Sequence, residues 1–228
     1  MDGAGPHPGG GIAPARPSRS WLGWLLPPAT ALIIIVAAVL VLMTPLWMHF
    51  AIPASGGGIR GLTVEDSLGI SDWTVEDLLL GGDFSVISGS DYVPVYTNAE
   101  AAHLRDARTV LWLGIFLAVV SVVLIGAALV HRPKDARRWR AVARGGAGLA
   151  VGAVIIGVIG YFAFDALFVL FHEVFFPGGN WEFPADSNMI RLYPFAFWQL
   201  TAAALGVLCV IGGGAVWYVA RRRARALA

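Results

Sequence analysis

Cysteine and charge are both scarce in this sequence. A single cysteine, Cys209, stands among 228 residues, so an intrachain disulfide is impossible and no CxxC or zinc-binding cysteine pattern exists. Cys209 also lies in the middle of an apolar run, where a thiol is unreactive. Charged residues make up only 14% of the chain, against about one quarter in a typical soluble domain. The sequence contains no GxSxG elbow, HExxH pair or P-loop, which excludes the best-known signatures of serine hydrolases, zinc proteases and nucleotide-binding enzymes.

Apolar residues predominate instead, and they are gathered into long runs. They make up 57% of the chain, and about 20 such residues in a row suffice for a helix to cross a bilayer. We therefore predict an all-α fold, a bundle of four transmembrane helices, with spans at about residues 29–50, 109–130, 145–171 and 195–220. Pro27 and Pro28 suit the start of the first helix, and Pro45 suits a kink near its end.

A cleaved signal peptide is the competing interpretation of the first apolar run. This run is longer than the roughly 7–15 residues of a signal core, which favours a membrane span. In the third span, Gly148-x-x-x-Gly152 and Ala153-x-x-x-Gly157 predict close contact with a neighbouring helix.

Charge is distributed unevenly between the two sides of the predicted spans. Short basic stretches at residues 16–19, 132–144 and 221–225 flank the spans on one side. The loop 51–108 carries nine acidic residues against three arginines and lies on the other side. Since basic loops stay in the cytoplasm, the regions 51–108 and 172–194 are predicted to lie outside the cell membrane. The position of the basic residues beside the spans gives no indication of a nucleic-acid partner.

The same rule places both termini in the cytoplasm. Residues 1–20 are rich in Gly and Pro and predict a disordered cytoplasmic tail before the membrane domain of residues 21–220. Residues 131–144 form a cytoplasmic loop, and residues 221–228 form a basic cytoplasmic tail.

Capping signals predict helices in the outer region. Thr97-Asn-Ala-Glu100 has the pattern of a capping box, so a helix is expected to begin at about Asn98 and to run into the second span without a breaker before Pro133. A shorter helix is predicted from Thr74 to Gly81, with a Thr cap and a Gly stop. Residues 83–96 are either a hairpin or an irregular loop.

A long aromatic segment, residues 171–198, separates the third and fourth spans. It holds His172, Arg191 and three acids, which are Glu173, Glu182 and Asp186. Six further side chains are typical of anchors at a membrane interface: Trp181, Phe183, Tyr193, Phe195, Phe197 and Trp198. Because a plain connector would be short and polar, we predict an aromatic cap in the membrane surface that forms one wall of an active site.

Three polar residues share one face at the start of the second helix. Glu100, His103 and Asp106 are spaced i, i+3 and i+6, so this face points at the outer interface. The plain interpretation is that Glu100 caps the helix and His103 is an ordinary interfacial residue. The functional interpretation makes His103 the other wall of the active site. Arg105 and Arg108 are either solvated or paired with lipid headgroups.

Asp165 is an acid inside the predicted third span. It precedes His172 by seven residues, about 10 Å along a helix, which is too far for a direct bond. Ionisable groups within a span are costly and usually face a cavity or a partner. Asp165 therefore either orients a histidine on another helix, binds water below His172, or is satisfied by a neighbouring helix.

Two blocks of sequence carry a resemblance to a known family. The first is Glu100-x-x-His103-x-x-Asp106-x-Arg108, at the head of the second span. The second is Phe171-His172-x-x-Phe175-Phe176, followed by Trp181 and by Met189-Ile190-x-Leu192-Tyr193-Pro194-x-x-Phe197-Trp198. Over about residues 25–220 the chain resembles the four-span bacterial membrane proteins characterised as lipoprotein intramolecular transacylases (Lit type).

The resemblance implies an enzyme of the bacterial cell membrane. Its substrate is a diacylglyceryl lipoprotein, and one acyl chain moves from the glyceryl ester to the N-terminal cysteine α-amino group, giving a lyso-form lipoprotein. An imidazole can accept the proton of the amine and return it to the leaving oxygen. Because both reacting groups belong to one molecule, no cofactor or metal is required. Membrane lipids are the other expected partners.

We assign His103 and His172 as the catalytic pair, with His172 as the favoured base because the aromatic cap can exclude water around it. Glu100, Asp106 or Asp165 would orient the imidazoles. The residues assigned to substrate binding are Arg191, Trp181, Tyr193 and Phe176. Arg191 alternatively pairs with Asp186.

Three rival functions fit the same pattern. A metal site would use His103, His172, Glu100 and Glu173 as ligands. A non-catalytic tetraspan scaffold would tolerate changes at both histidines. A membrane hydrolase would transfer the acyl group to water and release free fatty acid.

Overall fold

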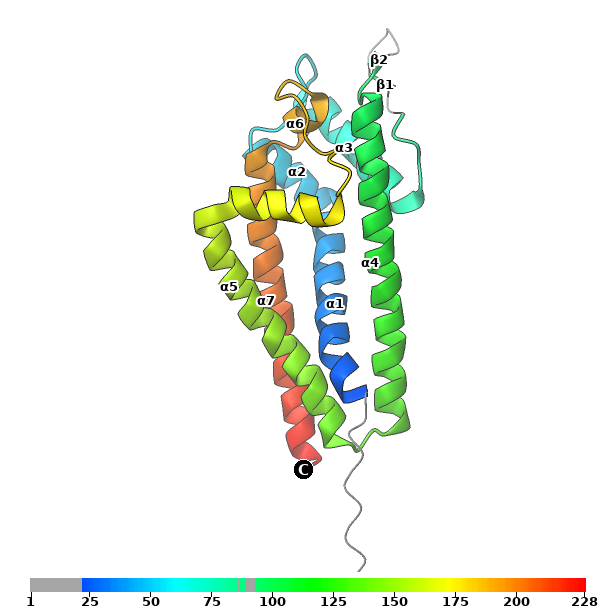
Figure 1. Ribbon diagram of the computed structural model, residues 1–228, viewed down its shortest axis with the longest axis vertical. Coiled ribbons are helices and arrows are strands. Elements are labelled where there is room, and N and C mark those ends of the chain that lie inside the picture. Colours follow the sequence, from blue (N-terminus) through cyan, green and yellow to red (C-terminus); the bar gives the residue numbers. More distant parts are fainter. Residues whose placement is uncertain (1–21, 86, 89–92) are drawn as a thin grey trace, which may run out of the picture.

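Four long helices dominate the protein and give it an elongated shape (Figure 1). The computed structural model describes residues 22–85, 87–88 and 93–228, so the predicted N-terminal tail lies outside the described residues. Within this part, the helices that are long and apolar enough to cross a membrane are α1 (Leu22–Leu42), α4 (Asn98–His131), α5 (Ala136–Phe175) and α7 (Phe195–Ala226). Helix α1 packs against each of the other three, and α5 packs most extensively against α7. The predicted all-α bundle of four transmembrane helices is thereby confirmed.

The first helix is placed differently from the prediction. Helix α1 begins at Leu22, so Pro27 and Pro28 lie in its second turn instead of at its start. The helix ends at Leu42, and Pro45 occupies the first turn of a separate helix, α2 (Pro45–Ala54). Pro45 thus starts a new helix rather than kinking the span, which agrees with the preference of proline for a first helical turn.

A loop domain with its own core covers one end of the bundle (Figure 1). It contains α2, α3 (Val64–Leu80), α6 (Asn188–Leu192) and the first turns of α4. Two short strands, β1 (Ile87–Ser88) and β2 (Val93–Pro94), pair in antiparallel fashion between α3 and α4. The buried core of this domain is formed by Met48, Ala51, Ile52, Ile59, Ile70, Phe84, Val95, Tyr96, Ala101, Leu104, Met189, Leu192, Tyr193 and Phe197.

Helix α3 is longer than the predicted segment from Thr74 to Gly81. A capping box of Thr63 and Asp66 starts it, with Asp66 N donating to Thr63 Oγ1 at 3.1 Å. Thr74 is an interior residue whose hydroxyl donates to the Ile70 carbonyl, so the predicted Thr74 cap was wrong. The predicted stop at Gly81 is confirmed, because this residue adopts a φ of 97°, which favours glycine.

The capping box at the start of α4 is confirmed. Thr97 N donates to Glu100 Oε2 at 2.7 Å, and Glu100 N donates to Thr97 Oγ1 at 3.3 Å. The helix then continues for 34 residues, about 51 Å, whereas the hydrocarbon core of a bilayer is about 30 Å thick. Its first turns therefore project beyond the membrane and into the loop domain.

Helix α5 bends where the prediction had a straight span. It contains 40 residues, and Ala163 has non-helical angles (φ −143°, ψ 43°). Beyond this point residues 164–175 lie across the end of the bundle, almost perpendicular to its long axis (Figure 1). We call residues 164–175 the flat segment. The third span therefore ends before the predicted residue 171. Asp165 follows the bend, and its side chain is exposed.

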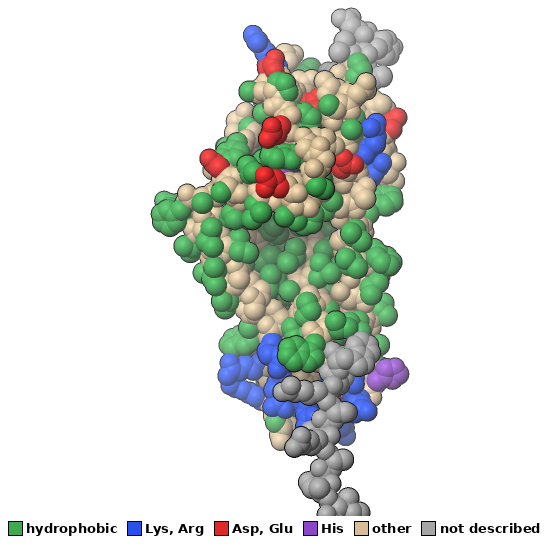
Figure 2. Space-filling model, viewed as in Figure 1, with side chains coloured by type: hydrophobic (Ala, Val, Ile, Leu, Met, Phe, Trp, Pro, Cys, Tyr) green, Lys and Arg blue, Asp and Glu red, His purple; other side chains and the backbone are tan. Residues whose placement is uncertain are grey.

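The charged side chains lie mainly at the two ends of the molecule. On the face shown in Figure 2, acidic residues lie around the loop domain, together with a few basic ones, and basic residues without acidic ones gather at the opposite end, near the C-terminus. The wide belt between the two ends is almost purely hydrophobic (Figure 2). This distribution is that of a multi-pass membrane protein, because a bilayer core excludes charge.

Close helix packing occurs at glycines other than the predicted ones. A Cβ atom at Gly148, Gly152 or Gly157 would meet nothing within 4 Å. A Cβ atom at Gly146 of α5 would instead lie 2.6 Å from the Gly213 carbonyl oxygen of α7, and one at Gly213 would lie 2.5 Å from the Gly146 oxygen. The predicted contact at Gly148 and Gly152 was wrong, although the general prediction of glycine-mediated packing by this helix is correct.

Replacing Gly146 with Val is expected to destabilise the bundle by about 1–3 kcal/mol, because the added atoms collide with the backbone of α7. Gly148→Val is the matched control, since its side chain would enter open space. The thermal midpoint of the detergent-solubilised protein measures the difference. Equal midpoints for the two variants would contradict the close approach of α5 and α7.

Candidate active site

The two histidines singled out from the sequence lie side by side. His103 is in the second turn of α4, and His172 is in the flat segment of α5. Their ring centroids are 6.0 Å apart, with planes 25° from parallel. Both side chains are buried, with 9% of His103 and 8% of His172 exposed. The expectation that these imidazoles converge, although nearly seventy residues apart in sequence, is confirmed.

Aromatic rings enclose the imidazole pair. Phe176 lies edge-on to His103 at 4.7 Å between centroids, and Phe183 does the same at 5.7 Å. Trp181 covers His172 at 4.8 Å, and Phe168 lies 4.2 Å from it on the preceding turn. The aromatic cap thus contributes Phe176, Trp181 and Phe183 to a dry enclosure around the two rings.

Burial keeps both imidazoles neutral near pH 7. His103 precedes the apolar run of α4, and His172 lies in the flat segment, so both are outside the membrane-spanning segments. Burial, and to a smaller extent the neighbouring His172, lower the pKa of His103 from 6.5 to about 4, while Asp106 acts in the opposite direction. Burial also lowers the pKa of His172, against a smaller opposite effect of its bond to Phe168.

The hydrogen bonds distinguish the two rings. His172 Nδ1 lies 2.8 Å from the carbonyl oxygen of Phe168. Since a carbonyl oxygen can only accept, Nδ1 carries the proton and the Nε2 lone pair of neutral His172 is free. His103 Nδ1 is buried and has no hydrogen-bond partner among the described residues. The site therefore presents one free imidazole lone pair and one buried, unpaired ring nitrogen.

Glu100 holds the backbone rather than an imidazole. Its side chain is 1% exposed. One carboxylate oxygen accepts from Thr97 N, and the other accepts from Met189 N of α6 at 3.0 Å. Glu100 therefore connects the helix that carries His103 to the aromatic cap, which differs from the predicted role of orienting a ring directly.

Asp106 and Asp165 also differ from their predicted roles. Asp106 Oδ2 accepts from Asn180 Nδ2 at 2.6 Å and so binds the cap. Asp165 makes no side-chain hydrogen bond or ion pair to any described residue and is exposed near the bend of α5. Neither carboxylate is hydrogen-bonded to a histidine ring in the described part of the chain.

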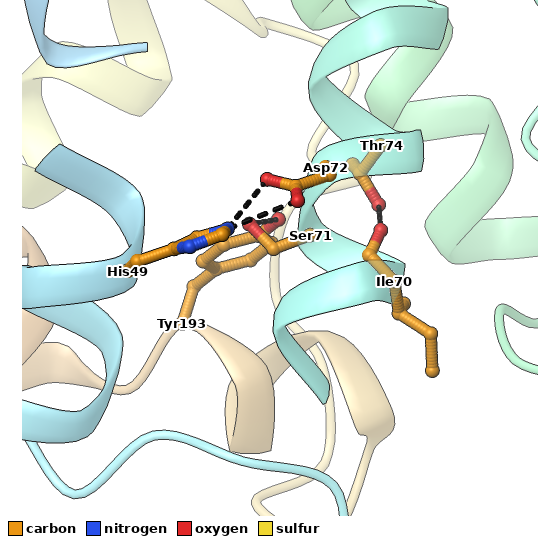
Figure 3. A network of polar contacts seen from close by, with 6 residues as sticks. All are labelled: His49, Ile70, Ser71, Asp72, Thr74 and Tyr193. Carbon is orange, nitrogen blue, oxygen red and sulfur yellow. Dashed lines mark hydrogen bonds and ion pairs between the residues drawn. The ribbon is translucent and has the colours of Figure 1, made fainter. Parts of the chain in front are cut away.

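Of the four residues predicted to bind substrate, Phe176 and Trp181 contact the imidazoles and the other two do not. The Tyr193 hydroxyl donates to Ser71 Oγ of α3 at 3.2 Å (Figure 3). Burial raises the pKa of Tyr193, so it stays neutral. The Arg191 carbonyl accepts from Gly58 N at 2.9 Å. The structure describes both Arg191 and Asp186 and shows no ion pair between them.

A third histidine was missed because the sequence placed it at the end of the first span. His49 of α2 lies 2.9 Å from both carboxylate oxygens of Asp72 in α3 (Figure 3). Both side chains are about 40% exposed, so this pair contributes little to stability. No spacing rule pairs the two residues, because they belong to different helices.

Arg108 was also misinterpreted as a solvated or lipid-facing residue. Its guanidinium donates to the carbonyl of Gly82 and lies 5.2 Å from the centre of the Phe84 ring. Trp112 Nε1 donates to the Leu78 carbonyl at 3.0 Å. These two α4 side chains thus satisfy carbonyls at the C-terminal end of α3, where a cation is favoured.

The geometry does not support the metal-site alternative. Among the described residues, no three His, Cys, Asp or Glu side chains gather as the ligands of one ion would. Both oxygens of Glu100 are engaged with backbone amides, and Glu173 is exposed. Only the two imidazoles of the proposed ligand set come together.

Comparison with known proteins gives matches in sequence and in fold. The family model of the lipoprotein intramolecular transacylase Lit matches residues 86–198. The membrane integral lipoprotein intramolecular transacylase Lit from Bacillus cereus has a similar fold, with a TM-score of 0.72 at 15% identity, covering 90% of this chain and 95% of that one. A second structure of that protein, with a histidine-to-arginine substitution, gives a TM-score of 0.66 at 16% identity and covers 90% and 91%.

An uncharacterized protein of Aquifex aeolicus (strain VF5) is 24% identical over 121 residues, which are 52% of this chain and 53% of the relative. The chain thus spans about half the length of this curated relative. The segment matched by the family model contains both histidines and the aromatic cap. The chain therefore resembles the lipoprotein intramolecular transacylase (Lit) family, whose model matches residues 86–198, and it shares the fold of the Bacillus cereus Lit structure over 90% of its length.

Proposed function

We propose that the protein is an acyltransferase that moves an acyl chain within a diacylglyceryl lipoprotein, from the glyceryl ester to the N-terminal cysteine α-amino group. The observation that carries this proposal is the buried imidazole pair of His103 and His172 at the outer edge of a membrane bundle. The family match supports the substrate class. The function needs a site that handles protons and excludes water, and the enclosed pair has both properties.

The proposed reaction is balanced without water, metal or an enzyme-bound acyl group. The amine nitrogen attacks the ester carbonyl, a C–N bond forms, and the C–O bond to the glyceryl oxygen breaks. The proton lost by nitrogen is delivered to that oxygen, giving an N-acyl lyso-form lipoprotein. Because nucleophile and ester belong to one molecule, holding them in contact supplies a large part of the rate enhancement.

His172 is the proposed base. Its Nδ1–H is held by the Phe168 carbonyl, so Nε2 is left as the proton acceptor. His103 then donates a hydrogen bond from its ring to the developing oxyanion or to the leaving oxygen, where a donor in a dry site is most effective. Phe176 and Trp181 would contact the substrate. Glu100 and Asp106 would support the site through the cap.

The lowered pKa values determine when the proton moves. An α-ammonium group has a pKa of about 7.7–8, so a buried imidazole with a lowered pKa is too weak a base to deprotonate it efficiently. The amine must therefore attack in its neutral form. Once the C–N bond has formed, the nitrogen becomes strongly acidic, and His172 can accept its proton and pass it to the leaving alkoxide.

The proposed orientation follows from the charge distribution. The basic residues lie at the end of the bundle where α4 ends, α5 begins and α7 ends. Because basic flanks stay in the cytoplasm, we assign both termini and the loop between α4 and α5 to the cytoplasm. The loop domain and the histidine pair then face the outside of the bacterial cell membrane. A lipoprotein carried in the outer leaflet would reach the site without crossing the bilayer.

Replacing either His103 or His172 with Gln is expected to reduce lyso-lipoprotein formation by about 10²–10⁴-fold, the usual contribution of acid–base catalysis. Mass spectrometry of the N-terminal lipoprotein peptide measures the product. His131→Gln, at the other end of α4, is the control. Wild-type rates in both active-site variants would refute the assignment, and free fatty acid in place of N-acyl product would identify a hydrolase.

The pH dependence tests the protonation states. Because low pH protonates the substrate amine while both imidazoles remain neutral, kcat/KM is expected to rise with pH through the amine pKa of about 7.7–8. No inflection is expected near the ordinary imidazole pKa of about 6.5. The measurement is kcat/KM as a function of pH, with vesicle-bound lipoprotein as the substrate. An inflection of kcat/KM at a pH of about 6.5 would contradict the lowered histidine pKa values.

A further inference from the structure

Two cavities adjoin the imidazole pair, and each is separated from His103 by one phenylalanine ring. The first has a volume of about 490 Å³ and is lined by Phe183 and by polar residues that include Glu182 and Asp186. We call it the polar cavity. The second, the interface cavity, has a volume of about 370 Å³ and is lined by Phe176 and by Val110 of α4. Neither histidine lines these two cavities, but Phe176 and Phe183 both contact the His103 ring, so each cavity has one wall residue against that imidazole.

Asn180 belongs to both cavities. It lines the polar cavity and the interface cavity alike, and its Nδ2 donates to Asp106 Oδ2 at 2.6 Å. This hydrogen bond therefore closes the boundary between the two spaces.

The segment that carries Asn180 is weakly attached. We call residues 177–187 the lid. At its ends the lid bonds to its neighbours in sequence, through Gly179 N to the Phe176 carbonyl and through Ser187, which accepts from Ile190 N and Arg191 N of α6. Between these ends, the Asn180–Asp106 bond is the one hydrogen bond from the described lid residues to another element. Pro177 and Gly179, whose φ is 71°, lie at one end of the lid. At the other end, Glu100 anchors α6 by accepting from Met189 N. The lid thus has two fixed ends and one polar contact between them.

The lid must move before any ester can react. Trp181 and Phe183 belong to it and cover His172 and His103, and both imidazoles are more than nine-tenths buried. The unpartnered Nδ1 of His103 is accordingly out of reach of a substrate in this arrangement.

We propose that the polar cavity and the interface cavity are the two halves of one substrate passage, which the lid closes through the Asn180–Asp106 latch. The inference rests on the proposed function and names where its substrate binds. The peptide of the diacylglyceryl lipoprotein occupies the polar cavity, and the glyceryl ester with its acyl chains occupies the interface cavity. Release of Asn180 from Asp106 joins the two halves and exposes the imidazoles between them.

The chemistry of the substrate fits this division. A diacylglyceryl lipoprotein has a polar peptide that points away from the membrane and acyl chains that remain in it. The interface cavity is lined by the apolar side chains of Val110, Phe175 and Phe176, beside the polar Asp106, Thr109 and Asn180. The polar cavity offers the side chains of Ser187 and Asn188 for hydrogen bonds to a peptide. The amine and the ester join the two parts of the substrate, so they would meet at the histidine pair.

Opening of the latch can be measured without an activity assay. Diethyl pyrocarbonate modifies accessible histidines, and peptide mass spectrometry gives the rate at His103 relative to His131. In Asn180→Ala the loss of the hydrogen bond is expected to raise the relative rate at His103 by roughly five- to tenfold. The matched control is Asn98→Ala, which removes an exposed asparagine of α4 that makes no side-chain hydrogen bond within the described residues. An unchanged rate in Asn180→Ala would refute the latch.

A reversible cross-link tests the passage itself. Cysteines at positions 109 and 180, which both line the interface cavity, are introduced in a Cys209→Ala background. A short bis-methanethiosulfonate reagent joins them and fixes the lid to α4. Product formation from vesicle-bound lipoprotein is expected to fall at least tenfold and to return when the reagent is reduced. Full activity of the cross-linked protein would overturn the proposal. If the wild-type protein forms no lyso-lipoprotein but Asn180→Ala still exposes His103, the result supports the latch and refutes the proposed reaction.

Discussion

The bend of α5 is the constraint on which the site depends. A helix of 40 residues is about 60 Å long, roughly twice the thickness of the hydrocarbon core, so it cannot cross the bilayer straight without carrying apolar turns far into water. The break at Ala163 resolves this mismatch by turning residues 164–175 almost perpendicular to the long axis of the bundle (Figure 1). That turn brings His172 against His103, which stands on the projecting first turns of α4.

Burial then sets the chemistry. Aromatic rings from the cap remove water from both imidazoles, and the same desolvation lowers their pKa values. An imidazole that is neutral at physiological pH can accept a proton at once, because it does not first have to release a proton to solvent. In the proposed reaction the substrate supplies its own nucleophile, so the protein needs only to position, desolvate and move one proton.

Much of the fold and part of the site could be predicted from the sequence, because the signals involved are local. The long apolar runs predict the four-helix bundle, and the capping box of Thr97 and Glu100 predicts where α4 begins. The bend at Ala163 could not be predicted, since neither proline nor glycine marks it. The partners of Glu100 and Asp106 also escaped prediction, because Met189 and Asn180 lie more than seventy residues away along the chain.

The buried Glu100 carboxylate has a consequence for assembly. One of its two backbone partners, Met189, lies 89 residues further along the chain than Glu100 itself, and chains are synthesised and fold from the N-terminus. When α4 is already in place, Met189 has not yet been made, so one oxygen of Glu100 must remain hydrated until α6 has been synthesised. Docking of α6 onto this oxygen therefore follows the formation of α4 and α5 in biogenesis. The rings of Phe176, Trp181 and Phe183 also follow both histidines in the chain, so the enclosure closes only after the aromatic cap has been made.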